Sequence, residues 1–252
     1  MVSCSDLVAC LQDMELSDGD TLLVHSSLSS FGHVEGGPCT VITALLSVIG
    51  EQGTLIMPAF SRYLLCGEDS WDRENTPSLM GAISETFRTW PGVIRSSHAA
   101  HSLASIGRHA ELICRRPHRT GFGADSPFHT FLTINGKVLL MGVSWQSCTF
   151  FHLLEAMADV PYRYLEERRA RITINGNTKA GSAWEYTRKE GYENDFGRLG
   201  RLLEDRGLVR IRVVGQSTLR LFEARDAYRV GMEELRKDPR FLLVQDEPHT
   251  RR

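Results

Sequence analysis

A histidine and a glutamate stand three residues apart, at His152 and Glu155, in the apolar segment CTFFHLLEAM (residues 148–157). Positions three apart lie on one face of a helix, so the two side chains can be neighbours. A carboxylate beside an imidazole keeps one ring nitrogen protonated and makes the other a better proton acceptor, which prepares a general base. Alternatively, His152 is a core histidine bonded to backbone, and Glu155 lies on a solvated face.

A second group of candidate residues follows the apolar run DTLLVHSSL (residues 20–28), which predicts a buried strand leading into a loop. His25 stands at the end of that strand, where doubly wound folds place their active sites. Small hydroxyl residues, paired glycines and a helix start come next, an arrangement that can present backbone N–H groups to a phosphate. The segment has neither a Walker loop nor GxGxxG spacing, and serine-rich turns are often only turns.

Further candidates lie in RSSHAAHSLASIG (residues 95–107), where Arg95, His98 and His101 could contact an anion. The two histidines also have a spacing that suggests a metal site, but no cysteine or acidic residue stands at ligand spacing, and we predict no metal. Cys148 is a conceivable thiolate nucleophile. It would share a helix with His152, whereas cysteine hydrolases usually bring the base from elsewhere in the fold.

Length and composition narrow the class of protein. The 252 residues are 42% hydrophobic and 24% charged, which suits one large domain or a domain with an appendage. A net charge of −2 argues against nucleic acid as a partner, and the apolar runs are too short to span a bilayer. The N-terminal segment has no signal-peptide pattern, and the six cysteines are scattered. We therefore expect reduced thiols and a cytoplasmic protein.

The pattern of elements predicts an α/β fold. Strands are expected at 20–26, 53–58, 101–107 and 137–143, with helices at 1–16, 38–49, 76–91, 108–116 and 148–157. Pro38 and Gly50 bound the second helix, Thr76 is expected as the N-cap of the third, and residues 59–75 are expected to be irregular. The prediction is a central mixed sheet flanked by helices, with a smaller α+β C-terminal portion. We assign 1–165 to the α/β core and 166–252 to the α+β portion of the same compact unit.

Taken in order, five segments resemble the aminoglycoside 3-N-acetyltransferase family, also called the antibiotic N-acetyltransferase family. They are LLVHSSLSSFGHVEGGPCTVITALL, GTLIMPAFS, NTPSLMGAISETFRTWPGVIRSSHAAHSLASIG, DSPFHTFLTINGKVLLMGV and TFFHLLEAM. The resemblance covers the chain up to about residue 165 and is looser in the last third. It implies direct transfer of an acetyl group from acetyl-CoA to an amine of an aminoglycoside or related amino sugar, in a ternary complex without a metal.

The resemblance also implies roles for single residues. His152 would be the general base, Glu155 would orient it, Thr149 would stabilise the oxyanion, and His25 lies at the same centre. Coenzyme contacts are expected from Ser26, Ser27, Leu28, Ser29, Ser30, Arg95, Ser96, His98 and Ser102. Acceptor contacts are expected from Glu68, Asp69, Asp72 and Asp125, although Asp125, with Ser126 before Pro127, could instead cap a helix.

Alternatives to this function stay open at the level of sequence. The acidic run GEDSWDREN (residues 67–75) could attract a polycation or be a solvated loop. The segment from Pro58 to Thr76 is shorter than the acceptor-binding insertion of classical resistance enzymes, so weak or narrow aminoglycoside activity is expected. The alternatives are an acyltransferase for another biosynthetic amine, a CoA-binding protein without turnover, or a hydrolase with Ser26 or Cys148 as nucleophile. No nucleic acid or membrane partner is expected, and the chain is predicted to be a monomer or homodimer.

Overall fold

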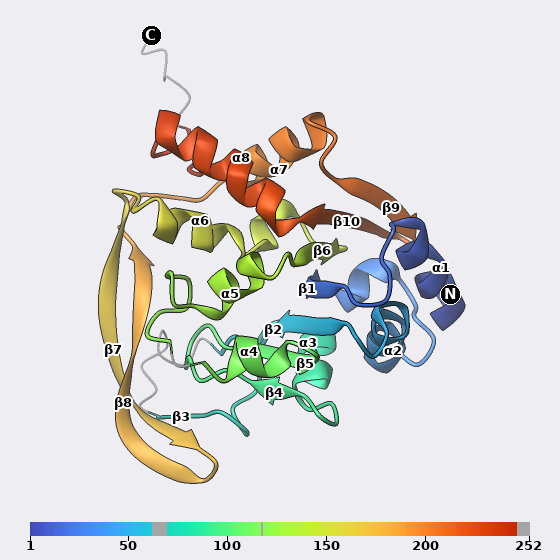
Figure 1. The fold of residues 1–252 in the computed structure, drawn as a ribbon, viewed down its shortest axis with the longest axis horizontal. Helices are drawn as coiled ribbons and strands as arrows, with labels where there is room; N and C mark the ends of the chain where they lie inside the picture. Colours follow the sequence, from blue (N-terminus) through green and yellow to red (C-terminus); the bar gives the residue numbers. More distant parts are fainter. Residues whose placement is uncertain (62–69, 117, 246–252) are drawn as a thin grey trace.

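Strand β1 (Thr21–Ser26) lies at the centre of a seven-stranded sheet in the computed structural model, which describes residues 1–61, 70–116 and 118–245 (Figure 1). Its neighbours β2 (Thr54–Pro58) and β6 (Lys137–Met141) run parallel to it. The outer strands are antiparallel: β5 (Leu103–Gly107) and β4 (Ile94–Arg95) on one side, β10 (Ser217–Glu223) and β9 (Arg210–Val214) on the other. The predicted mixed sheet is confirmed.

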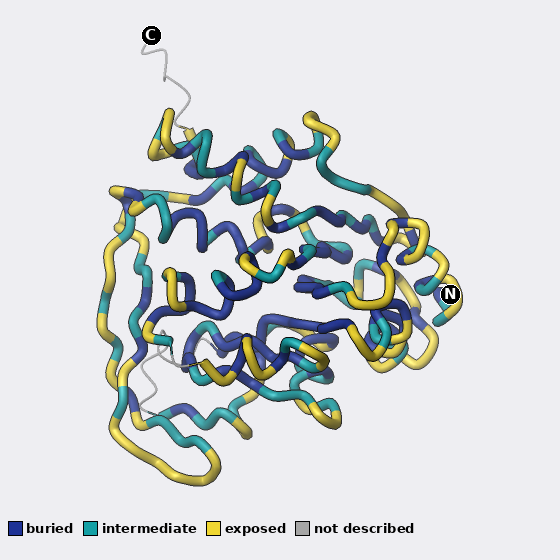
Figure 2. Tube along the Cα trace, in the orientation of Figure 1, coloured by how far each residue is buried: buried dark blue, intermediate teal, exposed yellow. Residues whose placement is uncertain are grey.

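Helices cover both faces of this sheet, as the uninterrupted burial of its central strands requires. One face carries α1 (Cys4–Asp13), α2 (Pro38–Ile49) and α3 (Ala82–Arg88). The other carries α4 (Ala110–Cys114), α5 (Pro127–Thr133), α6 (Phe151–Met157), α7 (Phe196–Asp205) and α8 (Ala224–Lys237). Figure 2 shows the central strands of the sheet, between these layers, as buried.

Successive side chains of β1 point to opposite faces, and this alternation decides where its histidine goes. Leu22 and Val24 pack with the α1–α3 layer, whereas Leu23 packs with the α4–α8 layer. His25 therefore points, like Leu23, to the face that carries α6. The alternation of side chains along β1 thus places His25 on the same face of the sheet as α6, the helix that carries His152.

A smaller sheet lies apart from the central one. Strands β7 (Arg163–Ile174) and β8 (Asn177–Arg188) form a long antiparallel hairpin, and β3 (Ser70–Asp72) pairs with β7. The hairpin runs down one side of the molecule, from α6 to β3 (Figure 1). The strands after residue 166 are thus shared between two sheets, and the boundary between residues 165 and 166 falls inside β7. The division into two portions stays a prediction.

The predicted limits of α2 are confirmed. Pro38 opens α2, and Gly50 follows its end with φ = +64°, where an added Cβ would lie 1.8 Å from Asp18 Oδ1. Helix α1 begins with a capping box formed by Ser3 and Asp6.

Two local predictions were wrong. Helix α3 begins at Ala82, because Thr76 is held in a turn by hydrogen bonds with the backbone of Asp72 rather than capping a helix. Strand β3 lies within the segment that was expected to be irregular. No helix in the described part of the chain is both long and apolar enough to cross a membrane.

Candidate active site

The site lies where the chain leaves β1 and β6. These strands are parallel and paired through Ser26 and Met141, so their carboxyl ends meet at one edge of the sheet. Gly142 follows β6 with φ = +68°, and a Cβ there would lie 1.7 Å from Ser30 Oγ. Glycine therefore allows the exit of β6 to touch the loop after β1. The chain then turns through the 3₁₀-helix η3 (Trp145–Ser147) into α6.

His152 and Glu155 form the predicted pair on α6. Nδ1 of His152 lies 2.6 Å from Oε2 of Glu155, one helical turn away. The glutamate is fully buried, while a quarter of the histidine side chain is exposed. The rings of Phe122 and Phe196 flank the imidazole at centroid distances of 5.0 and 4.9 Å. The two aromatic rings thus pack against the imidazole of His152, and part of the imidazole remains accessible to solvent.

Two residues outside α6 hold the carboxylate of this pair. Nε of Arg163, at the start of β7, lies 2.9 Å from Glu155 Oε2, and Nδ2 of Asn194 donates to Oε1 at 2.6 Å. Oδ1 of Asn194 in turn accepts hydrogen bonds from Arg163 at 2.9 Å and from Arg188 at 2.8 Å. Both carboxylate oxygens are therefore occupied, which a buried charge requires.

The electrostatics of the pair suit a neutral base. Burial opposes ionisation of Glu155, but the hydrogen bond from His152 and the charge of Arg163 outweigh it and hold the carboxyl pKa at about 2. Burial lowers the pKa of His152 despite the hydrogen bond to Glu155. Nη2 of Arg163 also lies 3.2 Å from Nδ1, but the Glu155 carboxylate is closer, at 2.6 Å, and favours the imidazole proton on Nδ1 and the lone pair on Nε2.

The buried polar atoms without a hydrogen-bond partner among the described residues include His25 Nε2, Ser26 Oγ and Thr149 Oγ1. All three atoms are buried, and burial without a partner is costly unless a ligand satisfies the group. Burial, and to a lesser degree the charge of His152, lowers the pKa of His25 to about 3, so this imidazole is neutral. The unpartnered atoms fit a polar substrate or coenzyme at the edge of the sheet.

The serine loop after β1 folds as the short 3₁₀-helix η1 (Leu28–Phe31), with Ser27 before it. Ser30 Oγ donates to the Ser27 carbonyl and contacts Ser217 Oγ at 3.0 Å, which joins the loop to β10. Ser27 Oγ lies 3.2 Å from Ser29 Oγ. Leu28 is half-buried and packs beside the α1–α3 core. Their contacts with a coenzyme stay a prediction.

Three of the residues expected to contact the coenzyme make contacts within the protein. Arg95 is buried and donates to Ser102 Oγ and to the carbonyls of Ala59 and Thr76. Ser102 Oγ also donates to Ala59, and Ser96 Oγ accepts from the Leu103 N–H. These contacts tie β4 and β5 to β2. The described structure therefore gives Arg95, Ser96 and Ser102 a bracing role, and their role at the coenzyme stays a prediction.

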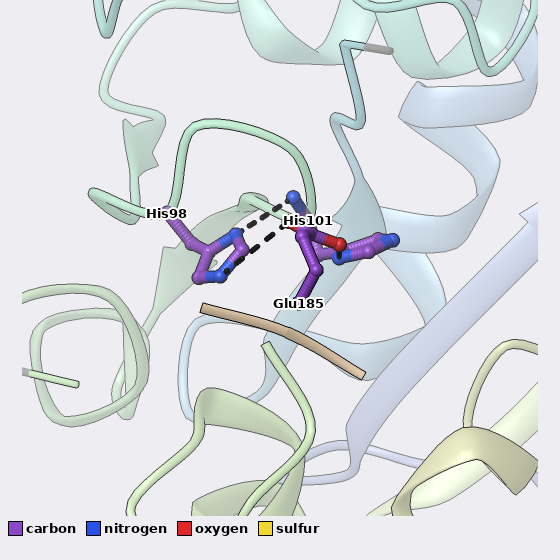
Figure 3. Close-up of side chains that lie close together, drawn as sticks. All are labelled: His98, His101 and Glu185. Atoms are coloured by element: carbon purple, nitrogen blue, oxygen red, sulfur yellow. Dashed lines mark hydrogen bonds and ion pairs between the residues drawn. The ribbon is translucent and has the colours of Figure 1, made fainter. Parts of the chain in front are cut away.

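His98, also expected to contact the coenzyme, lies in a cluster with His101 and Glu185, in which His98 and Glu185 are buried (Figure 3). Glu185 comes from β8, and its Oε2 lies 3.0 Å from His101 Nδ1. The three side chains offer nitrogen and oxygen atoms that all lie within 4.8 Å of one another. Sequence spacing did not bring Glu185 into the search for an acidic partner, because it follows the histidines only through the β7–β8 hairpin.

The acidic residues expected at the acceptor have local partners where they are described. Asp72 accepts from the backbone N–H groups of Glu74 and Asn75, and Asp125 accepts from the Arg119 N–H and the Thr120 hydroxyl. Both carboxylates therefore stabilise turns. Ser126, and not Asp125, caps α5. Glu68 and Asp69 lie outside the described residues, so acceptor contacts from this set stay a prediction.

Cys148 is fully buried and ends η3, before α6 begins, so it does not share the helix with His152 as expected. Burial raises the pKa of its thiol far above the usual range, so the thiolate is suppressed. The five cysteines in the described ranges are free, as predicted.

Sequence reasoning missed Arg163 and Asn194. Both lie beyond the end of α6, and Asn194 follows Glu155 by 39 positions. The available signal was chemical: a glutamate among Phe151, Leu153 and Leu154 needs a cationic or donor partner from elsewhere.

Comparison with known proteins gives one family. The family model described as aminoglycoside 3-N-acetyltransferase matches residues 23–236. The aminoglycoside N(3')-acetyltransferase-like protein YokD from Bacillus subtilis is 35% identical over 240 residues, which is 86% of each chain.

Solved structures agree with this match. A variant of aminoglycoside acetyltransferase AAC(3)-IVa in complex with a gentamicin is 31% identical, with a TM-score of 0.80 over 97% of this chain and 92% of that one. The binary complex of AAC-IIIb with CoASH has a TM-score of 0.85 at 24% identity, over 98% of this chain and 99% of that one, and shares the fold.

Proposed function

The chain belongs to the aminoglycoside 3-N-acetyltransferase family, and from this premise we propose that it transfers the acetyl group of acetyl-CoA to an amino group of an aminoglycoside or related amino sugar. The observation that carries the proposal is the His152–Glu155 pair beside the Thr149 hydroxyl, which has no hydrogen-bond partner among the described residues. The gentamicin complex of AAC(3)-IVa supports an amino sugar as acceptor.

His152 performs the proton transfer in this proposal. An amine becomes nucleophilic only with a free lone pair, and it must lose a further proton as its nitrogen bonds to the acetyl carbon. Nε2 of His152 accepts that proton while Nδ1–H remains bonded to Glu155. The imidazolium then protonates the sulfur as the C–S bond breaks, so that coenzyme A leaves as a thiol. Glu155, held by Arg163 and Asn194, stabilises the intermediate positive charge.

Thr149 and the serine loop would hold the donor. Acetyl-CoA, when bound, supplies a thioester carbonyl as the electrophile. The Thr149 hydroxyl, which has no partner among the described residues, is available to donate to the carbonyl oxygen as negative charge develops there. Ser26, whose hydroxyl is also unpartnered within the described part of the chain, belongs to the loop that would bind the phosphates. The burial of Cys148 favours direct transfer over an acetyl-cysteine enzyme.

The test is thiol release from acetyl-CoA with a panel of aminoglycosides and simple amino sugars. His152→Ala should lower turnover by about two orders of magnitude or more and leave acetyl-CoA affinity nearly unchanged. His109→Ala is the matched control. His109 follows β5, which is antiparallel to β2, so it lies at the opposite ends of the central strands from the site. Its backbone N–H donates to Oγ1 of Thr54, a bond that the substitution leaves in place.

Two outcomes would contradict the proposal. Retention of most activity in His152→Ala would remove this residue from the mechanism. An acetyl mass on the protein after incubation with acetyl-CoA alone would instead favour a covalent route through Ser26 or Cys148.

A further inference from the structure

Acetylation of an ammonium group must dispose of two protons. The acceptor begins with three hydrogens on nitrogen and ends as an amide with one. His152 returns the proton that it takes to the leaving sulfur, because a thiol with a pKa of about 8.5 is protonated at neutral pH. One proton therefore leaves the site by a different route, and the reaction needs a group that receives it.

We propose that His101, backed by Glu185, is a second proton acceptor that takes the first proton from the acceptor's ammonium group and passes it to solvent. This inference rests on the proposed function. The N–H bond of the ammonium breaks, its electron pair stays on the amine nitrogen, and the proton moves to Nε2 of His101. The imidazolium is stabilised by the Glu185 carboxylate and returns to its neutral form by losing the proton to water.

The geometry of the pair suits this role. Glu185 Oε2 lies 3.0 Å from Nδ1 of His101, an ion-pair distance, although Nδ1 makes no well-aligned hydrogen bond to any of the described residues. The Glu185 side chain is 4% exposed and the His101 side chain 22% exposed, so a buried carboxylate stands behind an imidazole that reaches solvent. Glu185 Oε1 has no hydrogen-bond partner among the described residues, so its negative charge is not offset by a hydrogen bond and can stabilise an imidazolium.

The ring of Phe122 contacts both His101 and His152. The centroid of Phe122 lies 4.8 Å from the imidazole of His101 and 5.0 Å from that of His152. After burial and the effects of Glu155 and Arg163, the charge of His101 also contributes to the lowered pKa of His152.

The groups that face His101 come from several elements. His98 precedes it in the same turn, and His118 stacks on His98 at a centroid distance of 6.0 Å. Glu185 comes from β8, and Arg168 of β7 acts on that carboxylate. Burial lowers the pKa of His98 to about 4 and also lowers that of His118, so neither competes for the proton at neutral pH.

A metal ion would be the other use of this cluster, and the tautomer of His98 argues against it. The backbone N–H of His101 donates to Nδ1 of His98 at 3.0 Å, so the lone pair of Nδ1 is engaged (Figure 3). A neutral imidazole then carries its proton on Nε2, which faces the Trp184 carbonyl at 3.3 Å. To bind a metal, Nε2 would have to be unprotonated. In ligating histidines the other ring nitrogen usually carries the proton and donates it to an acceptor, whereas Nδ1 of His98 faces a donor.

The experiment compares two acceptors at one pH with His101→Gln, Glu185→Gln and the control His109→Gln. One acceptor has an amine that is almost wholly protonated at the assay pH, and the other has a weakly basic amine that is already largely neutral. With the first, His101→Gln should lower kcat/KM by roughly 10- to 100-fold, as for other positioned bases. With the second acceptor, kcat/KM of His101→Gln should stay within about twofold of the parent value, because that amine has no first proton to lose. Glu185→Gln should show the same selectivity with a smaller loss.

Other outcomes overturn the inference. An equal loss with both acceptors assigns His101 to binding or folding, and no loss with either removes it from proton transfer. Activity that a chelator abolishes and zinc restores assigns the cluster to a metal. If the parent acetylates no amine, the proposed function fails and this inference with it, whereas a failure of the inference alone leaves the parent active.

Discussion

Replacing Glu155 by glutamine tests whether charge, and not only shape, holds the catalytic pair. The variant keeps the size of the side chain and removes the charge that Arg163 and His152 face. The difference between the ordinary carboxyl pKa of 4.5 and about 2 in the protein corresponds to about 3 kcal/mol in favour of the ionised form. Because glutamine imitates the protonated acid, the variant should be less stable than the parent by about that amount at pH 7.

The pH dependence has a defined sign. The pKa of Glu155 is lower in the folded protein than in the unfolded chain, so its contribution is complete above pH 4.5 and is lost as the pH falls toward 2. Urea unfolding followed by circular dichroism should therefore show a constant difference between pH 7 and about 5 and a shrinking one below. Glu190→Gln is the control, because its exposed side chain should change stability by less than about 0.5 kcal/mol.

The same variant should affect catalysis less than the loss of His152. The hydrogen bond to Glu155 raises the pKa of His152 against the opposing effect of burial. Without the carboxylate, the acid limb of the kcat profile should move to lower pH, and turnover should fall roughly tenfold because the base is weaker. Equal stability of variant and parent, or an acid limb that stays in place, would refute the reasoning. A loss larger than that of His152→Ala would require the two roles to be reassigned.

Three other side chains near the site give direct tests. Cys148→Ser should keep most of the activity, since the buried thiol is not ionised; an acetyl adduct on the parent that disappears in the variant would contradict this. Asn194→Ala should cost about 2 kcal/mol in a urea titration and lower turnover, because a buried oxygen of Glu155 loses its donor, while the exposed Asn177→Ala serves as the control. Acidification from pH 6.5 to about 4 should destabilise the parent by about 3 kcal/mol through His25 alone, because the unfolded chain binds a proton that the buried imidazole, with a pKa of about 3, refuses. His25→Gln should flatten that part of the stability profile, and an unchanged slope would show that His25 is already solvated.

The features that the sequence predicted correctly depend on interactions between residues that are close along the chain. Helix α2 is bounded by Pro38 and Gly50, whose backbone preferences act within a few residues. The His152–Glu155 pair depends only on the helical repeat, which brings positions three apart together in any surroundings. The placement of β1 followed from an apolar run long enough to be buried on both faces. The family resemblance rested on these same segments.

Tertiary structure decided the parts that depend on partners far along the chain. Thr76 is a residue type that often caps helices. Its hydroxyl instead accepts from the Asp72 backbone N–H and its carbonyl accepts from the Arg95 guanidinium, so α3 begins later. The arginine and asparagine that hold Glu155, and the glutamate behind His101, come from the β7–β8 hairpin and the loop after it. Buried charges need partners, but no periodicity in the sequence states which residue supplies them. That choice is made when the hairpin packs against α6 and the turn before β5.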